Sequence, residues 1–336
     1  NYQHNSRGEV ILGSNGRPLP IASDALTISK LTYLDRGTLA KKEYLRLFPS
    51  LNGSFNVREN LVLRGAHYHS IGRPNFNQYS GGLTLPDIES APSASNRISV
   101  NNAGIKPWTA RSTSARLEYY FAAVGQVSIS GFVRDFRNFF GSTATPATPA
   151  FLALYGLDPA IYGGYDVATQ QNIGSALRMS GWTLSYKQAL TFLPSWARGM
   201  QVFANGTEQR LEGDDSAKGN LQTFYPRTAS WGASLNRESF NLRTTFSYRG
   251  KRRNALITGA SIDPGTYNWN QSKLQIDVLG EYRLTRQLSV FANMRNVNTA
   301  LDEDIQNYGP RTPAFAKIQH LGDLGALWTI GVKGSF

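Results

Sequence analysis

The histidines are the side chains of this sequence best suited to binding a metal. His67 and His69 are separated by one residue, so on a strand both would point to the same side, as two ligands of one ion must. The other two, His4 and His320, lie far away in the sequence, and no further ligands are evident nearby. Imidazoles beside Tyr68 also suit a boundary between polar and apolar surroundings. The sequence therefore predicts no metal site.

Clustered carboxylates are the second group that could do chemistry. Asp302, Glu303 and Asp304 are consecutive, and Asp214 precedes Asp215, but neither group has the spacing of a calcium loop, and both suit polar loops. The sequence contains no nucleophile elbow, phosphate-binding glycine loop or supported pair of catalytic carboxylates. A protease or phospholipase would need a Ser–His or Asp–His set on strand ends, and none stands out. We therefore expect neither enzymatic activity nor a cofactor.

Segments with alternating apolar and polar residues run through the chain in pairs, each pair joined by a short turn. In one of them Leu274, Ile276 and Val278 fall on one face, while Gln275 and Asp277 fall on the other. A period of two with one apolar face is typical of a strand in a sheet. The pattern predicts about eleven strands, at residues 44–57, 61–71, 111–121, 126–140, 180–192, 199–211, 229–236, 240–248, 273–282, 288–297 and 327–336.

The connections between these strands differ strongly in length. A transmembrane β-barrel has this asymmetry, because tight periplasmic turns join its strands at one end and long extracellular loops join them at the other. In a soluble sandwich the apolar face would be the core, but nothing would segregate short and long connections. We therefore predict an all-β fold, an antiparallel transmembrane β-barrel whose apolar face contacts lipid. Its long loops are expected near residues 72–110, 141–178, 212–228, 249–272 and 298–326.

The composition agrees with a barrel and excludes other classes. Of the 336 residues, 17% are charged and 12% are aromatic, and the mean hydropathy is −0.35. No apolar run approaches the roughly 18 residues of a membrane helix, whereas barrel strands intersperse apolar residues with polar ones. The absence of cysteine excludes disulfides and thiolate metal sites.

The chain carries a formal net charge of +12. A nucleic-acid-binding protein would gather this charge on one face, but the basic residues are scattered, and the densest group, residues 249–253, begins a loop. No aromatic stacking platform accompanies it. We therefore expect no nucleic acid partner. The charge is interpreted as belonging to lumen walls and to loops that face anionic lipopolysaccharide.

The last strand ends in an aromatic side chain. Trp328, Ile330, Val332 and Phe336 alternate onto one of its faces. This pattern resembles the signal by which the barrel-assembly machinery of bacteria recognises outer-membrane barrels. Its physical basis is that the final strand is an open pairing edge until it is sealed. We predict that these four residues form an outer-membrane insertion signal.

Several stretches resemble TonB-dependent receptors in their order and spacing. Residues 48–52, 60–66 and 72–76 look like the mid-barrel hairpin of that family. Residues 105–109 and 117–121 resemble its "LKPE(T/W)" loop and the strand that follows. Later strands of the family are matched by residues 131–139, 247–251 and 288–297.

The resemblance implies a barrel of about 22 strands with an N-terminal plug inside it. In such receptors a short motif on the plug meets TonB, which transmits energy for the uptake of a scarce nutrient across the outer membrane of Gram-negative bacteria. Residues 1–336 are then expected to be the C-terminal part of the barrel domain, about 11 of the 22 strands. Residues 1–43 are expected to form an extracellular loop and the end of a preceding strand. The plug and signal peptide are expected to be absent from this chain.

Two other functions stay open on the sequence alone. One is a passive, porin-like outer-membrane channel, and the other is a soluble β-rich binding domain. The nutrient could be an iron chelate or an oligosaccharide, because aromatic loop residues such as Tyr155, Tyr162, Tyr165 and Trp269 suit both. No small-molecule contact is assigned to a particular residue.

Overall fold

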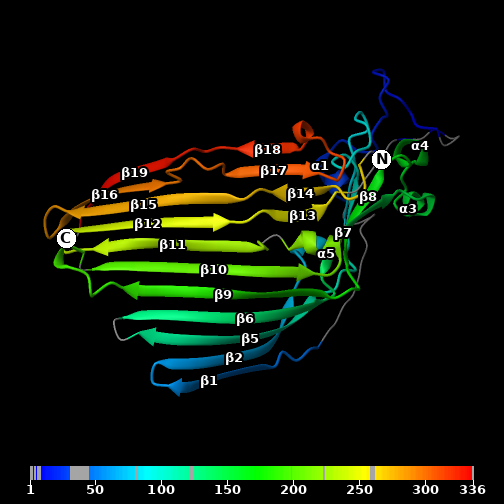
Figure 1. Ribbon diagram of the computed structural model, residues 1–336. Coiled ribbons are helices and arrows are strands. Elements are labelled where there is room, and N and C mark those ends of the chain that lie inside the picture. The colour runs from blue at the N-terminus through cyan, green and yellow to red at the C-terminus, as the bar shows by residue number, and fades with distance from the viewer. Residues whose placement is uncertain are drawn as a thin grey trace.

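An antiparallel sheet of eleven strands dominates the computed structural model, which describes residues 3, 5, 9–30, 45–79, 82–121, 124–197, 199–221, 224–257 and 262–334. Each strand pairs with the next one in chain order within this sheet, and β1 and β19 lie at its two edges (Figure 1). The eleven predicted strands are confirmed. They are β1 (Ser50–Arg58), β2 (Leu61–Gly72), β5 (Trp108–Phe121), β6 (Gly125–Arg137), β9 (Leu177–Ala189), β10 (Met200–Glu212), β11 (Arg227–Asn236), β12 (Phe240–Arg249), β15 (Lys273–Arg283), β16 (Leu288–Arg295) and β19 (Leu327–Gly334).

Several strand boundaries differ from the prediction by three residues or more, among them the start of the first strand and the end of the fourth. The first strand was expected from residue 44, which lies outside the described residues, but residues 45–49 are irregular and β1 begins at Ser50. The fourth strand was expected to reach Phe140, but it ends at Arg137. Asn138 then takes a positive φ of 54°, and Phe140 opens a different strand. An extended strand cannot continue through this left-handed conformation.

The apolar face of the sheet is open. Leu63 pairs with Leu117, Leu117 with Ile129, and Ile129 with Leu184, so four apolar side chains form one row across neighbouring strands. These side chains are 44%, 39%, 51% and 44% exposed. Within the described part of the chain, no second sheet or helical layer covers them. Lipid contact accounts for such a face, whereas a sandwich would bury it.

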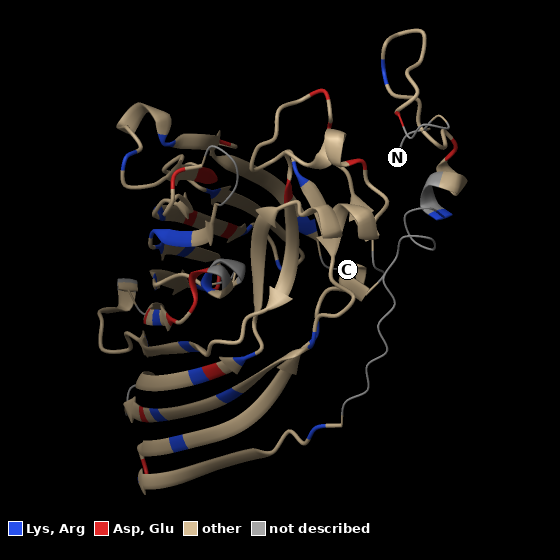
Figure 2. Cartoon of the chain, turned by 90° about the vertical axis from the view of Figure 1, so that its right-hand side faces the viewer, with Lys and Arg blue, Asp and Glu red and all other residues tan. Residues whose placement is uncertain are grey.

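The opposite face of the sheet is polar. Arg64 pairs with Arg116 across β2 and β5, and Glu118 lies two residues further along β5. Side chains of this kind line the interior of an outer-membrane barrel. Seen from the loop end, the sheet curves as an open arc (Figure 2). The fold is therefore an antiparallel, partial β-barrel.

The long connections are more structured than the sequence suggested. Two further four-stranded sheets are built from segments that were expected to be loops, and both lie at the end of the large sheet opposite its short turns (Figure 1). One contains β13 (Arg252–Leu256), β14 (Tyr267–Asn270), β17 (Glu303–Tyr308) and β18 (Ile318–Gly322). The other contains β3 (Gly82–Thr84), β4 (Ile98–Asn101), β8 (Asp166–Asn172) and β7 (Phe140–Pro146).

The helices of the described segments are all short. None of them is long and apolar enough to cross a membrane. They are α1 (Ala25–Lys30), α2 (Phe76–Tyr79), α3 (Pro149–Leu154), α4 (Pro159–Tyr162), α5 (Asp215–Asn220), η2 (Ser195–Ala197) and η3 (Ala314–Ala316).

The best-buried apolar side chains lie in the loop region. Ile98, Leu152 and Tyr162 are 0–1% exposed and form one cluster with Tyr155 and Tyr165. A second cluster packs the loop-side ends of β5, β6 and β9 against α5. These clusters hold the loop region to the end of the sheet, and they position the polar groups described next.

Candidate functional site

The polar face carries a network of charged side chains near the short turns. Glu118 receives Arg64 Nε at 3.1 Å and Arg116 Nε at 3.2 Å. The Tyr120 hydroxyl donates to the same carboxylate at 2.8 Å, and Arg116 donates to the Ser128 hydroxyl at 3.1 Å. Both carboxylate oxygens of Glu118 therefore have partners, and the network holds these charged side chains in place on the polar face.

A second polar group lies in the small sheet β13–β14–β17–β18, and we call Lys251, Trp269, Tyr308 and Lys317 the cation–aromatic site. The Trp269 and Tyr308 rings are stacked, with centroids 5.3 Å apart and planes inclined by 8°. Lys251 Nζ lies 4.7 Å from the Trp269 centroid and 5.0 Å from that of Tyr308, and it is hydrogen-bonded to the Tyr308 hydroxyl. Lys317 Nζ lies 4.9 Å from the Tyr308 centroid. Two ammonium groups therefore flank one aromatic pair.

An adjoining group extends the positive charge toward α5. The Arg253 guanidinium lies 4.4 Å from the Tyr267 centroid and forms an ion pair of 2.6 Å with Asp215. Asp215 also accepts hydrogen bonds from the Tyr267 hydroxyl at 2.6 Å and from Lys218 at 3.0 Å. Arg252 lies 4.7 Å from the Tyr225 centroid. Two cations and one tyrosine hydroxyl are thus gathered around the Asp215 carboxylate, with the Arg252–Tyr225 pair in the same basic segment.

The ionisation of this adjoining group follows from its contacts. Burial opposes the charged form of Asp215, but hydrogen bonds from Tyr267 and Lys218 and the charge of Arg253 outweigh it, so the pKa of Asp215 is lowered. The hydrogen bond to Asp215, with some burial, raises the pKa of Tyr267. Tyr267 stays a neutral donor and Asp215 a carboxylate at neutral pH.

Two buried donors in the same sheet region have no acceptor. Trp269 Nε1 and Gln271 Nε2 are shielded from solvent without a hydrogen-bond partner in the described part of the chain. Each such donor costs roughly 1–3 kcal/mol relative to a satisfied one. Trp269 therefore combines a stacked ring with an indole N–H that an oxygen-bearing ligand could satisfy after a local rearrangement.

The two neighbouring histidines lie away from this region, on the apolar face. The rings of His67 and His69 have centroids 5.5 Å apart, and His67 Nδ1 lies 2.9 Å from the Thr113 hydroxyl oxygen. His4 lies outside the described residues, and His320 Nε2 is 3.1 Å from Glu303. No group of three or more metal-binding side chains occurs among the described residues.

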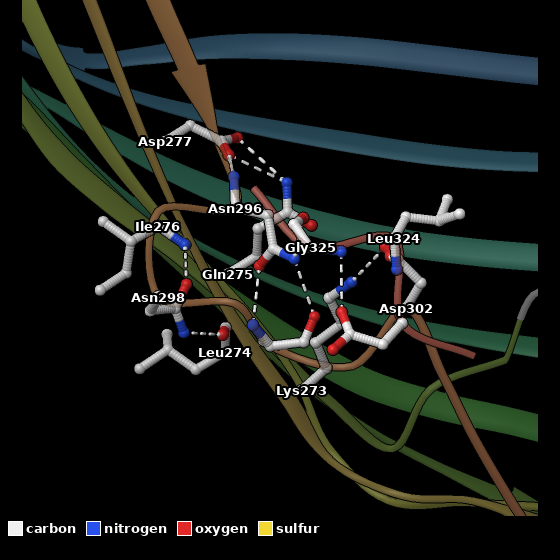
Figure 3. Close-up of polar contacts among 12 residues, drawn as sticks. Lys273, Leu274, Gln275, Ile276, Asp277, Asn296, Asn298, Asp302, Leu324 and Gly325 are labelled. Carbon is white, nitrogen blue, oxygen red and sulfur yellow. Dashed lines mark hydrogen bonds and ion pairs between the residues drawn. The ribbon is translucent and has the colours of Figure 1, made fainter. Parts of the chain in front are cut away.

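The consecutive acidic residues turn toward different partners. Asp302 forms an ion pair with Lys273 at 3.0 Å and accepts the Leu324 amide at 2.9 Å (Figure 3). The hydrogen bonds from Lys273 and from Leu324 lower the pKa of Asp302. Glu303 faces His320, and Asp304 accepts from Gln306 at 3.2 Å. The three carboxylates therefore bind neighbouring polar groups of the loop region and do not converge on one site.

The predicted insertion signal is described in part. Trp328, Ile330 and Val332 share the apolar face of β19 and are 59%, 76% and 65% exposed. Lys333 on the opposite face approaches Glu281 at 3.8 Å. Phe336 lies outside the described residues.

The aromatic loop residues named from the sequence divide into two groups. Tyr155, Tyr162 and Tyr165 are buried in the apolar cluster with α3 and α4, so they stabilise the loop region. Trp269 belongs to the cation–aromatic site. The sequence reading missed Tyr308 and Lys317 because they come from a different connection, although the basic group 249–253 already marked one side of the site.

Comparisons with known proteins identify relatives of this architecture. A family model described as "TonB dependent receptor-like, beta-barrel" matches residues 24–297. No curated protein sequence matches the chain.

Solved structures resemble the fold at low sequence identity. A mutant of the ferric enterobactin receptor PfeA from Pseudomonas aeruginosa has a TM-score of 0.59 and 16% identity over 86% of this chain and 40% of its own. The copper transporter OprC has a TM-score of 0.54 and 16% identity, over 85% and 39%. The siderophore receptor PirA from P. aeruginosa has a TM-score of 0.54 and 13% identity, over 86% and 42%. The chain thus spans about 40% of the length of the structures it resembles.

Proposed function

Because this chain belongs to the TonB-dependent receptor-like β-barrel family, we propose that it takes part in the TonB-driven uptake of a scarce nutrient through the outer membrane of a Gram-negative bacterium. The family consists of receptors that transport, not enzymes. The open apolar face and the polar opposite face support a position in a bilayer. The proposed partners are TonB, the barrel-assembly machinery, lipopolysaccharide and a small-molecule ligand.

We also propose that residues 1–336 are the C-terminal part of the barrel domain. The sheet has two edge strands, β1 and β19, and unpaired backbone groups are too costly in the hydrocarbon region to leave open. Further strands would pair with these edges, and a plug inside the closed barrel would carry the contact to TonB.

The nutrient that fits the cation–aromatic site best is an anionic metal chelate with aromatic groups. Lys251 and Lys317 supply positive charge, and the stacked Trp269 and Tyr308 rings supply a flat apolar surface. A neutral oligosaccharide would use the rings but would leave the charges without a counterpart. This juxtaposition carries the proposal, and the ferric enterobactin and siderophore receptors among the similar structures accord with it.

Uptake of two labelled iron complexes tests the proposal. In cells with the native gene edited on the chromosome, we expect transport of an anionic ferric tris-catecholate and little transport of the cationic complex of desferrioxamine B. Lys251→Gln with Lys317→Gln should lower catecholate uptake about tenfold or more, since two charge-assisted contacts are lost. Arg286→Gln with Arg58→Gln, at exposed residues near the short turns, removes the same charge and should leave uptake unchanged.

Energy dependence separates the receptor from a passive channel. Deletion of the TonB gene should abolish uptake. Uptake that persists without TonB would indicate a porin-like channel, and equal uptake of both iron complexes would contradict the assigned ligand class.

A further inference from the structure

A cluster of basic side chains lies on the membrane-facing side of the sheet, at its loop end. In register, His69 of β2 pairs with Arg111 of β5, and Arg111 pairs with Asp135 of β6. These positions are six residues from Leu63, Leu117 and Ile129 on the same strands, so they share the apolar face. The cluster therefore points out of the barrel and not into its lumen.

These side chains surround a small pocket. Arg46, from the segment before β1, joins His69, Arg111, Asp135 and Arg137 around a volume of about 170 Å³. We call these five residues the outward basic pocket. Asp135 is engaged by Arg178 at 2.6 Å. Arg46, Arg111 and Arg137 are exposed and form no ion pair with another described residue. Among the described residues, the pocket thus holds three guanidinium groups without an ion-pair partner.

An apolar groove lies beside the pocket on the same face, over β1, β2 and β5 and nearer the short turns. It has a volume of about 580 Å³, and Leu51, Phe55 and Leu63 form its apolar walls. Its floor is formed by small residues, because Gly53 pairs with Gly65 and Gly65 with Ala115. His67 lines this groove, and His69, two residues further along the same face, lines the basic pocket.

We propose that the outward basic pocket and the apolar groove together bind one phosphorylated lipid of the outer leaflet. The pocket lies at the loop end, which is extracellular in a barrel of this class, and therefore at the level of the outer-leaflet headgroups. Three guanidinium groups match a phosphate by charge and by bidentate hydrogen bonding. The groove below accepts an acyl chain, and because that chain is already out of water in the membrane, close van der Waals packing favours the contact. The site rests on the outer-membrane position proposed above, but it does not depend on which nutrient is transported.

The carboxylate in the pocket sets the strength of this binding. Asp135 offsets one of the positive charges and holds Arg178. Replacing Asp135 by Asn would remove a negative charge and release Arg178, so a lipid phosphate would meet a more positive surface. We therefore expect the Asp135→Asn variant to bind the lipid more tightly. A variant that merely misfolds would bind less tightly, so the two outcomes can be told apart.

Native mass spectrometry tests whether the pocket binds the phosphorylated headgroup. The protein is extracted in detergent from cells that carry the edited gene. The probes are lipid A with both phosphates, the same lipid without phosphates, and inorganic phosphate. We expect bisphosphorylated lipid A to bind at least about tenfold more tightly than the phosphate-free lipid. We expect inorganic phosphate to compete weakly, because it gains nothing from the groove. Equal binding of the two lipids, or full competition by phosphate, would overturn the proposal.

Matched variants locate the phosphate site. Arg46→Gln, Arg111→Gln and Arg137→Gln together should weaken lipid A binding about tenfold or more, and Asp135→Asn should strengthen it several-fold. The control removes three exposed arginines at the opposite end of the sheet: Arg58→Gln, Arg283→Gln and Arg286→Gln. The proposal fails if both triple variants bind alike or if Asp135→Asn does not bind more tightly. Dimers that form through this face without lipid would also overturn it.

A second pair of variants locates the acyl chain. A Cβ at Gly65 would meet no heavy atom within 4 Å, so Gly65→Leu can be made without a clash at Cβ and places a side chain in the groove. Gly206, which pairs with Leu184 on the same apolar face, can be changed to Leu as the control. We expect Gly65→Leu alone to lower lipid A retention several-fold. Equal retention by the two variants would place the acyl chain elsewhere and contradict the proposed groove.

Discussion

The backbone amide of Asn296 donates a hydrogen bond of 2.9 Å to the carboxylate of Asp277, and this contact joins the end of β16 to the polar face of β15 (Figure 3). Asn296 is 5% exposed and has a positive φ of 55°. Its side chain donates to the carbonyls of Ala300 and Gly325 at 2.8 and 3.1 Å. One residue therefore ties both ends of the long connection between β16 and β19 to the barrel wall.

Asn296→Gly tests this anchor. Glycine keeps the positive φ at little cost, so the change removes mainly the side-chain hydrogen bonds. We expect a loss of roughly 1–3 kcal/mol and faster proteolysis within residues 298–326. Thr299→Gly is the control, since Thr299 also has a positive φ but is exposed. Equal proteolysis of both variants would show that Asn296 is no anchor.

The contacts of Asp215 predict a dependence of loop structure on pH. Because the pKa of Asp215 is lowered from its ordinary 3.8, its contribution to stability is present above that value and is lost as the pH falls through the lower folded value. Tryptophan fluorescence, followed from about pH 6 to pH 2, should report loosening of α5 from Tyr267 and Arg253 in the acidic part of this range. Asp215→Asn should remove this step, and an unchanged profile would refute the assignment.

The apolar face is predicted to contact lipid. Leu184→Arg should destabilise the protein in the membrane by about 2–4 kcal/mol if the residue lies near the bilayer centre. The neighbouring Ser185→Arg places the same charge on the polar face and should cost much less. Heat-modifiable migration on gels measures both. Equal losses would mean that the two faces do not differ in their surroundings.

The insertion signal remains a prediction that assembly can test. Deletion of Phe336, or Ile330→Asn, should lower the amount of heat-modifiable protein in outer membranes several-fold, because the final strand is then recognised poorly. Thr329→Asn, which alters the other face of β19, should have little effect. If Thr329→Asn were as harmful as Ile330→Asn, the face pattern would not be the signal.

The barrel strands could be predicted because each carries its own pattern. Alternation within β15 is visible without its neighbours, and tight turns set the pairing of successive strands. The small sheets could not be predicted in this way. Strands β4 and β8 are short and pair in parallel, Ile98 with Val167, across a long stretch of chain. Their pairing depends on residues that are far apart in the sequence, and a local pattern of apolar and polar residues does not indicate such pairing.

The candidate site was predictable only in part for the same reason. The basic group that includes Lys251 and the loop aromatic Trp269 both stand out in the sequence, but nothing local indicates that Tyr308 stacks on Trp269. The outward basic pocket is still less visible. Its arginines come from three separate segments, and they converge only because the register aligns Arg111 with His69 and Asp135.

The small sheet β13–β14–β17–β18 draws its strands from two separate connections, since Tyr267 pairs with Tyr308 across them. Hydrogen bonding between the two connections couples their movements, so neither connection can move independently of the other. The mouth on this side of the barrel therefore behaves as a stiff collar. A ligand of the proposed receptor would meet a rim that is already formed and would be selected by how well it fits that rim.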